Sequence, residues 1–382
     1  MDVIALLVAF LAVIWLQMVI FGALPFRKLD YRCDFSVKEA HEGDSIYLVE
    51  TVHNCKLLPV PWLKVDIHTS RWLDFAGSCS TVAQESRRVT SSFTLRSYQK
   101  ITRKWKLKCL KRGVFTTENV TLVSGDLLNL YVSSVPRAVN ASLVVYPEIV
   151  DLDGMFIPVN LMQGDRVVNR WIVDDPFIVA GARDYAAGDP MNRIHWLASA
   201  RTGKLMVKKN EHTSQNSLAI LLNMQSRLYE HEDIINREIA EIGIKVTATL
   251  LDRALKDGMS VRFGTNGCVR SDDRQAIFTG NAANKEHTSE IFKILARLIM
   301  KNVKDFENFM LDILPSLENT EIIIVTAYLS KRICELADLM AEAGNTVSII
   351  LLESEFEKGI KPCNCELYVP ATENMMKAWE TG

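Results

Sequence analysis

The chain has 382 residues, of which 48% are hydrophobic and 24% are charged, and its formal net charge is −2. This composition excludes a disordered chain, and the length is sufficient for two or three globular units with cores of their own. The charge is uneven, because the residues from Ser217 onward contain 18 Lys and Arg against 25 Asp and Glu, whereas the residues before Ser217 carry a net +5. We therefore expect the two halves to have different neighbours.

The eight cysteines do not follow the spacing of a small disulfide-rich fold, so we expect unpaired thiols in a reducing compartment. Only Cys363 and Cys365 are close in the sequence. A single Cys-x-Cys with no second pair and no nearby His is a poor zinc pattern. The cysteines therefore predict no metal site.

The segment from Val3 to Leu24 is almost entirely apolar and is interrupted only by Gln17. About 20 such residues suffice to span a bilayer as a helix, so we predict a transmembrane helix at residues 1–26. A cleaved signal peptide is the alternative, but no Lys or Arg precedes the apolar run. Arg27, Lys28 and Arg32 follow it, and the positive-inside rule then places the soluble domains in the cytoplasm of a single-pass cell membrane protein.

Residues 30–150 alternate between apolar and polar positions in short runs that turn residues separate. Strands at this spacing, with no convincing helix between them, predict an antiparallel β-sandwich. Pro59 and Pro61 favour an edge or a connection over a central strand at that point. The strands are expected at residues 45–52, 62–68, 91–95, 105–110, 120–123 and 142–146.

One of these strands has a strongly basic face, because Lys104, Lys106 and Lys108 alternate with apolar residues from Trp105 to Cys109. The simpler interpretation is a solvated outer face whose lysines also discourage edge pairing. The alternative is a face that lies against anionic lipid, where each Lys contributes about 1 kcal/mol.

A segment dense in charged and aromatic residues follows, and we call Arg183 to Leu205 the hallmark block. It reads Arg-x-Tyr-x-x-Gly-Asp from Arg183 and Arg-Ile-His-Trp-x-Ala-Ser-Ala-Arg-x-Gly-Lys-Leu from Arg193. It has neither the helical nor the strand period, so its polar groups must satisfy each other or bind a partner. Its candidate binding residues are Arg183, Asp184, Tyr185, Gly188, Asp189, Arg193, His195, Trp196, Ser199, Arg201 and Lys204.

The two motifs of the hallmark block resemble the signature of the domain of unknown function 58 family, which has no established reaction. The resemblance implies a β-sandwich-like module followed by a von Willebrand factor type A-like α/β domain. It also implies a bacterial protein that works with a MoxR-type AAA+ ATPase.

The residues of the block leave two interpretations open. Its arginines, carboxylates and aromatic rings can form an internal network that docks the sandwich onto the next domain. They can also form a groove for an acidic or phosphorylated partner, with a basic rim of Arg201, Lys204, Lys208 and Lys209. A hydrolase triad of Asp189, His195 and Ser199 is disfavoured, because no nucleophile elbow surrounds Ser199.

From Ser217 onward, strands expected at residues 218–222, 260–263, 321–326 and 346–352 alternate with helices expected at 233–255, 289–314 and 331–343. Gly264 is expected to end the second strand, and the first helix is based on Ile235, Ile239, Ile242 and Val246. This order predicts a doubly wound α/β domain with ligands at the carboxyl ends of its strands.

The order also resembles the type A fold, which often holds a metal ion through Asp-x-Ser-x-Ser after its first strand. The corresponding residues are Asn223, Gln225 and Arg227, and an amide pair with a cation is a poor site for Mg²⁺. We therefore expect no metal and no cofactor at this degenerate site.

These observations predict a transmembrane helix at 1–26, a β-sandwich at 30–150, a connector with the hallmark block at 151–216 and the type A-like domain at 217–382. The expected role is a membrane-tethered, non-catalytic interaction module or assembly factor. The alternatives are a hydrolase-like enzyme with a site near Asn223, Thr326 and His195, or a cell-envelope biogenesis factor. No nucleic-acid motif and no P-loop occurs, so we expect no nucleic acid as partner.

Overall fold

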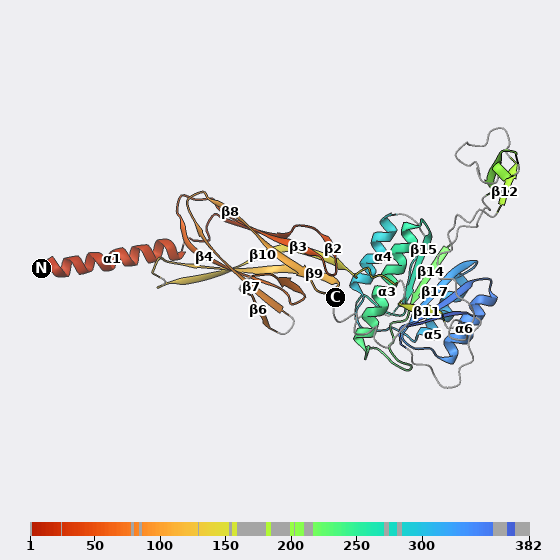
Figure 1. Cartoon of the computed structure of the whole chain (residues 1–382). Coiled ribbons are helices and arrows are strands. Elements are labelled where there is room, and N and C mark those ends of the chain that lie inside the picture. Colours follow the sequence, from red (N-terminus) through yellow and green to blue (C-terminus); the bar gives the residue numbers. More distant parts are fainter. Residues whose placement is uncertain are drawn as a thin grey trace. The chain divides into compact units, whose positions relative to one another are not determined.

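A computed structural model shows two compact units (Figure 1). Unit 1 comprises Met1–Glu148 with Phe292–Leu298, and unit 2 comprises Ile149–Ile291 with Ile299–Gly382. The structure describes residues 2–23, 25–77, 80–83, 86–128, 130–152, 155–158, 181–184, 199–201, 203–209, 217–270, 275–280, 285–353 and 365–370.

Unit 1 begins with helix α1 (Asp2–Ala23), which is followed by strands in two sheets. The four-stranded sheet has the order β1-β3-β8-β5, and the six-stranded sheet has the order β2-β10-β9-β4-β7-β6. All neighbours pair antiparallel except β2 and β10. The strands are β1 (Leu29–Phe35), β2 (Glu39–His41), β3 (Ser45–Asn54), β4 (Val60–Ser70), β5 (Leu73–Phe75), β6 (Ser80–Ala83), β7 (Ser86–Leu95), β8 (Lys100–Cys109), β9 (Gly113–Gly125) and β10 (Val132–Tyr146).

The predicted β-sandwich is confirmed, and the alternation of side chains explains it. In β3, buried and more exposed residues alternate along the whole strand, and Leu48 and Val52 have no exposed surface. Apolar side chains from both sheets share one core. The proline segment differs from expectation: β4 begins at Val60 and lies inside its sheet, and a register shift between Val60 and Leu63 accommodates Pro61.

The alternation in β8 is as the sequence indicates. Leu107 and Cys109 are buried, whereas Lys104, Lys106 and Lys108 are exposed. The structure thus gives this strand one apolar and one basic face. Whether the basic face contacts lipid stays a prediction.

The core of the sandwich buries the carboxyl group of Glu50. It accepts hydrogen bonds from Tyr31 Oη at 3.1 Å, Ser91 Oγ at 2.8 Å and Trp105 Nε1 at 3.2 Å. Burial raises the pKa of Glu50, although the donor groups around it act in the opposite direction. The core is therefore sensitive to the protonation state of this residue.

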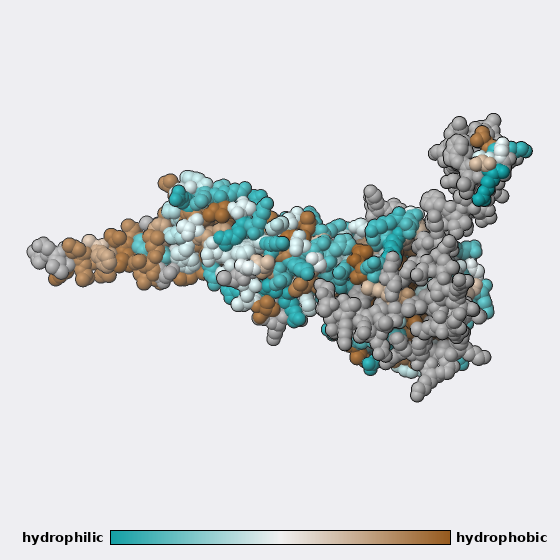
Figure 2. Space-filling view, viewed as in Figure 1, coloured by the Kyte–Doolittle hydropathy of each residue, from teal (hydrophilic) through white to brown (hydrophobic). Residues whose placement is uncertain are grey.

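Helix α1 exposes apolar side chains along its length. Most large apolar residues between Ile4 and Leu16 are more than half exposed, and Figure 2 shows the hydrophobic surface that they form. Within the described residues, we find no helix with both the length and the apolar character needed to cross a membrane. The transmembrane helix predicted at residues 1–26 is thus not confirmed.

Unit 2 contains a seven-stranded sheet with the order β11-β19-β18-β17-β14-β15-β16. The inner pairs from β19 to β15 are parallel, and the edge strands β11 and β16 are antiparallel. Its elements are β11 (Phe156–Pro158), β14 (Ser217–Leu222), α3 (Arg237–Lys256), β15 (Ser260–Thr265), β16 (Ile277–Phe278), α4 (Lys285–Arg297), α5 (Phe306–Ile313), η3 (Leu314–Ser316), β17 (Thr320–Thr326), α6 (Lys331–Glu342), β18 (Thr346–Leu351) and β19 (Glu366–Pro370). A separate two-stranded sheet pairs β12 (Gly181–Asp184) with β13 (Met206–Lys209).

Helices cover both faces of the large sheet. Every residue of β14 is buried, and Leu221 belongs to a core that includes side chains of α5 and α6. On the other face, a Cβ added to Gly243 of α3 would lie 3.2 Å from Leu222. This part of unit 2 is therefore a doubly wound α/β sheet.

Three expectations for unit 2 need correction. The first helix begins at Arg237 after the cap Asn236, so Ile235 precedes it and is exposed. Strand β15 continues through Gly264, where a Cβ would lie within about 3 Å of the side chains of Leu221, Phe278 and Phe309. The helix expected at residues 289–314 is two helices, because backbone amides between them, such as Val303 N, bond to other loops.

Candidate functional site

The strand order of unit 2 places a candidate site where the chain changes direction in the sheet. Starting from β14, the chain builds outward through β15 to β16, and then returns to the other side of β14 with β17, β18 and β19. At such a point the loops after two adjacent strands turn in opposite directions. A crevice therefore forms at the carboxyl ends of these strands, where α/β proteins bind ligands. The residues after β14 and β17 are therefore the first to consider.

Asn223, directly after β14, is held by its neighbours on both sides. Its Nδ2 donates to Thr326 Oγ1 at 3.0 Å, and its Oδ1 accepts from Gln225 N at 3.0 Å and from Asn266 Nδ2 at 3.3 Å. Asn223 and Thr326 are buried, with exposures of 2% and 0%. The amide thus ties the ends of β14, β15 and β17 together and is not open to a ligand.

Gln225 lies beneath the crevice and connects the loop after β14 to the start of α5. Its Oε1 accepts from the backbone N–H of Phe306 at 2.8 Å, and its Nε2 donates to the carbonyl of Glu230 at 2.8 Å. The same Oε1 lies 3.4 Å from Tyr328 Oη, which donates to it. Burial, and then the charge of Glu307, raise the pKa of Tyr328, so this hydroxyl remains a donor at neutral pH.

The loop after Gln225 is fixed by the carboxylate of Glu230. Ser226 Oγ donates to it at 3.0 Å, and the backbone N–H groups of Ser226 and Ile235 also donate to it. Asn302 Nδ2 donates to the carbonyl of Glu230 at 3.0 Å. The loop therefore has a defined path that leaves Tyr229 at its tip, 81% exposed and with a positive φ of 62°.

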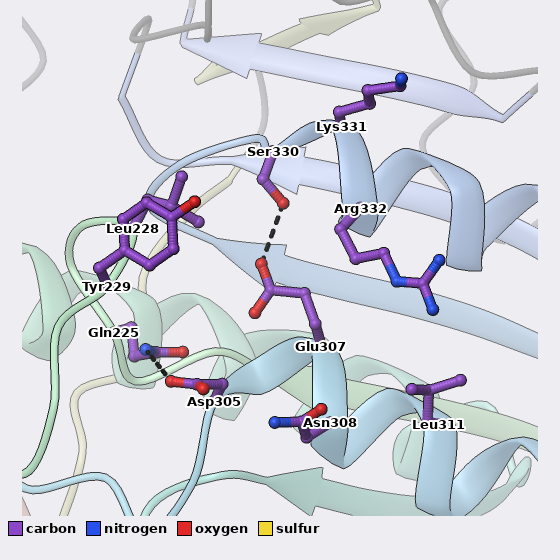
Figure 3. A pocket seen from close by; sticks show the side chains of 10 residues that line it. All are labelled: Gln225, Leu228, Tyr229, Asp305, Glu307, Asn308, Leu311, Ser330, Lys331 and Arg332. Carbon is purple, nitrogen blue, oxygen red and sulfur yellow. Dashed lines mark hydrogen bonds between the residues drawn. The ribbon is translucent and has the colours of Figure 1, made fainter.

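Above this network is a pocket with a volume of about 380 Å³. Figure 3 shows Gln225 and Asp305 at its base, joined by a hydrogen bond of 3.4 Å, and Ser330 above Glu307. Ser330 Oγ donates to Glu307 Oε1 at 2.9 Å. The pocket is lined by Gln225, Leu228, Tyr229, Asp305, Glu307, Asn308, Leu311, Ser330, Lys331 and Arg332.

Charges of both signs surround the pocket. Asp305 precedes α5 and lies 3.3 Å from His231 Nδ1, and Glu307 lies in the first turn of that helix. Arg332, near the start of α6, pairs with Glu335 at 3.0 Å. The pocket is thus polar and bears charges, whereas small-molecule sites are mostly apolar.

The three residues at the position of the type A metal site behave differently. Asn223 and Gln225 meet at the carboxyl end of β14, as the spacing predicts. Arg227 is exposed and does not line the pocket. Within the described residues, no group of three or more His, Cys, Asp or Glu side chains could hold a metal ion.

Only part of the hallmark block can be located. Arg183 and Asp184 belong to β12, where Asp184 pairs in register with Met206 of β13. Ser199 Oγ accepts from Met206 N at 2.8 Å, which gives this hydroxyl a structural role beside the sheet. Arg201 and Lys204 are exposed. The other candidates, Tyr185, Gly188, Asp189, Arg193, His195 and Trp196, lie outside the described residues.

The pocket includes residues that sequence reasoning missed. Asp305, Glu307 and Asn308 fall within the region that was expected to be one continuous helix. Ser330 and Lys331 stand at the start of α6, where Ser330 caps the helix by accepting from Ile333 N at 3.1 Å. A Ser or Asp before an apolar helical pattern is a recognisable cap, and this signal could have marked both positions.

A search of curated proteins finds no match to the chain. Among solved structures, the chain is similar to a non-cellulosomal cohesin from Archaeoglobus fulgidus, with 12% identity over 30% of this chain and 91% of the cohesin and a TM-score of 0.21. It is also similar to the CARDB domain of the PF1109 protein from Pyrococcus furiosus, solved with di-metal ions, with 11% identity over 31% and 90% of the two chains and a TM-score of 0.22. These scores are too low to support an argument.

The sporulation control protein Spo0M from Bacillus subtilis shows 13% identity over 30% of this chain and 49% of its own, with a TM-score of 0.18. The match to a family is more specific and supports the resemblance found in the hallmark block. Residues 181–354, which include the block from Arg183 onward and every residue of the pocket, match the family described as Protein of unknown function DUF58.

Proposed function

We propose that this protein is a membrane-tethered, non-catalytic interaction module that binds a protein partner at the pocket beside β14 and β17. The observation that carries this proposal is the character of the pocket rim, where an exposed Tyr229 stands among charged side chains. Tyr and Arg are enriched in protein interfaces, and a charged rim around a small contact is typical of them. The buried amides beneath keep the rim in place.

We further propose that unit 2 is a von Willebrand factor type A-like domain without a metal ion. The strand order around β14 and the position of Asn223 and Gln225 after that strand support this proposal. Where a carboxylate and hydroxyls would bind Mg²⁺, this chain has amides that already bond to each other. Contact through a metal ion is then replaced by direct contact with side chains of the rim.

The tether in this proposal is the apolar segment from Val3 to Leu24, with the soluble units in the cytoplasm. The exposed apolar residues of α1 support it, because such a surface in water is unfavourable. Arg27 and Lys28, both exposed, follow the run as the positive-inside rule requires.

The partner that the family resemblance implies is a MoxR-type AAA+ ATPase. The test is affinity recovery of the full-length protein from its native membrane after crosslinking. Wild type is compared with the double variant Asp305→Asn/Glu307→Gln, which changes the charge of the pocket. The matched control is Glu318→Gln/Glu342→Gln, which removes two exposed carboxylates at the opposite, amino ends of β17 and β18.

We expect the pocket variant to lose the partner and the control to recover it like wild type. A second variant, Arg201→Ala, tests the hallmark block in the same assay. Equal recovery from the pocket variant and the control would contradict a contact at the pocket. Recovery that depends on Arg201 alone would move the contact to the hallmark block.

A further inference from the structure

Three loops of the sandwich lie at the end from which α1 leaves, and we call them the helix-proximal loops. They are residues 55–59 between β3 and β4, residues 96–99 between β7 and β8, and residues 126–131 between β9 and β10. The pairing of Leu29 with Asn54, of Val60 with Leu95, and of Val132 with Gly125 places all three at this end. Each of these loops joins two strands at the end of the sandwich that carries α1.

Hydrogen bonds hold the first two loops against the residues that follow α1. Cys55 N donates to the carbonyl of Lys28 at 2.9 Å, and Lys56 Nζ donates to the carbonyl of Pro25 at 2.6 Å. Tyr98 N donates to the carbonyl of Lys56 at 3.2 Å, and Tyr98 has a positive φ of 55°. The loops are therefore ordered, although their tips face outward.

The tips of these ordered loops are apolar. Leu57 is 74% exposed, Tyr98 64% and Leu130 62%, and Leu127, Leu128, Tyr131 and Val132 are also exposed. The other large apolar side chains of unit 1 that are exposed outside α1 are mostly less so, at 42–45% for Val37, Tyr47, Leu110 and Val114 and 55% for Val82. A cluster of exposed Leu and Tyr on fixed loops is unfavourable in water and indicates a surface that is covered.

Exposed cations occur at the same end of the sandwich as these apolar tips. Arg27, Lys28, Arg96 and Lys100 are exposed at the same end of the sandwich. Among the described residues of the three loops, the only carboxylate is that of Asp126, which is fully buried. Apolar and aromatic tips accompanied by exposed cations complement the headgroup layer of an anionic bilayer.

The contact between α1 and the third loop shows how far along the helix this loop extends. Gln17 Nε2 donates to Asp126 Oδ2 at 2.9 Å, and Tyr131 N and Leu128 N also donate to that carboxylate, at 2.7 Å and 3.2 Å. Gln17 precedes Leu24, the end of the apolar run, by seven residues. At 1.5 Å per helical residue, the loop reaches about 10 Å back along the helix, toward its N-terminus.

A loop that reaches this far back along an apolar helix cannot remain in bulk water if the helix spans a bilayer. If only the apolar residues on the N-terminal side of Gln17 crossed the bilayer, the span would be shorter than the roughly 30 Å of a hydrocarbon core. The bond to Asp126 also explains the single polar residue of the run, because an amide in lipid needs a protein partner. The apolar tips lie at the end of the sandwich from which the apolar α1 leaves, and Asp30, an exposed acid at this end, pairs with Arg32 at 3.2 Å.

We propose that the helix-proximal loops insert into the interfacial layer of an anionic bilayer and form a second membrane contact beside α1. The occupant is lipid, since the loops lie beside the apolar helix and their charged residues, apart from the buried Asp126, are the cations Lys56 and Arg96. This inference rests on the proposed tether. It also differs from the alternative that the basic face of β8 contacts lipid, because Lys108 pairs in register with Ser45, at the other end of the strands.

The test reconstitutes the full-length protein in vesicles of phosphatidylcholine and phosphatidylglycerol that contain a lipid with a photoactivatable group near the headgroup. After irradiation, mass spectrometry locates the labelled peptides. Wild type is compared with Leu127→Ser/Leu128→Ser/Leu130→Ser, and thermal melting checks that the variant is folded. The matched control is Leu110→Ser, which also removes an exposed Leu, but after β8 at the other end of the sandwich.

We expect label in α1 and in the 126–132 peptide of wild type and of the Leu110→Ser control, and a loss of label from that peptide in the triple variant. Label in α1 with none in the three loops would overturn this inference and leave the tether intact. An unlabelled α1 would overturn both. Label on the peptide of Lys104 to Lys108 instead of the loops, or crosslinks from the loops to protein alone, would also overturn it.

Discussion

Replacing Gln225 with alanine is expected to destabilise the N-terminus of α5. The side chain provides an acceptor for the N–H of Phe306 and a donor for the carbonyl of Glu230, both at 2.8 Å. Gln225 is 1% exposed, so its removal leaves buried polar groups without these partners. Each such group costs about 1–3 kcal/mol, and water entering from the adjacent pocket offsets part of this. We expect a net loss of about 2–3 kcal/mol in the local opening free energy.

Hydrogen exchange of the full-length protein measures this loss directly. Because about 1.4 kcal/mol corresponds to a factor of ten, the amides at the start of α5 should exchange roughly 30- to 150-fold faster in Gln225→Ala than in wild type. The control is Asn308→Ala, an exposed residue of the same pocket. Exchange in Gln225→Ala within about threefold of that control, a difference of well under 1 kcal/mol, would refute the assignment of Gln225 as the support of the pocket.

Three further predictions concern the two cores and one helix cap. Burial raises the pKa of Glu50, so the stability of wild type relative to Glu50→Gln should be greatest below the ordinary glutamate pKa and fall as pH rises through the raised value. A difference in unfolding free energy that stays constant between about pH 4 and pH 8 would contradict this. Gly264→Ala should cost about 1–3 kcal/mol because the new Cβ meets three side chains, whereas Gly280→Ala, with nothing within 4 Å, should change stability by less than about 0.5 kcal/mol. Equal melting shifts for the two would show that this contact can relax. Ser330→Ala should cost about 1 kcal/mol through loss of its cap, and Asp305→Ala should cost less from capping because its side chain makes no cap hydrogen bond. Melting curves compare these two variants, and a larger loss for Asp305→Ala would contradict the capping argument.

The sequence predicted the sandwich well because its long strands alternate strictly. In β3 and β8 the alternation extends over ten residues each, which is enough to distinguish a strand from a helix. Strand β5 has three residues and β6 has four, so a period of two has no room to show itself. Their existence depends on pairing with β8 and β7, which only the folded chain provides.

The candidate site was predictable only in part, for a related reason. Asn223 and Gln225 follow the first strand of the α/β pattern, so their position at the carboxyl end could be inferred locally. Asp305 and Glu307 come about 80 residues later, and the apolar period of the helices on both sides concealed the break before them. That break forms because Asn302 N and Val303 N bond to backbone carbonyls of other loops, and such long-range bonds leave no periodic signal.

The separation between the buried amides and the rim of the pocket has a consequence for how this protein can change. The network of Asn223, Gln225 and Asn266 stabilises the sheet, whereas the charged side chains stand on the first turns of α5 and α6. Substitutions at Asn308 or Lys331 therefore alter the outer surface with little effect on folding. The chemistry of the rim can thus change through a few residues while the same scaffold is retained.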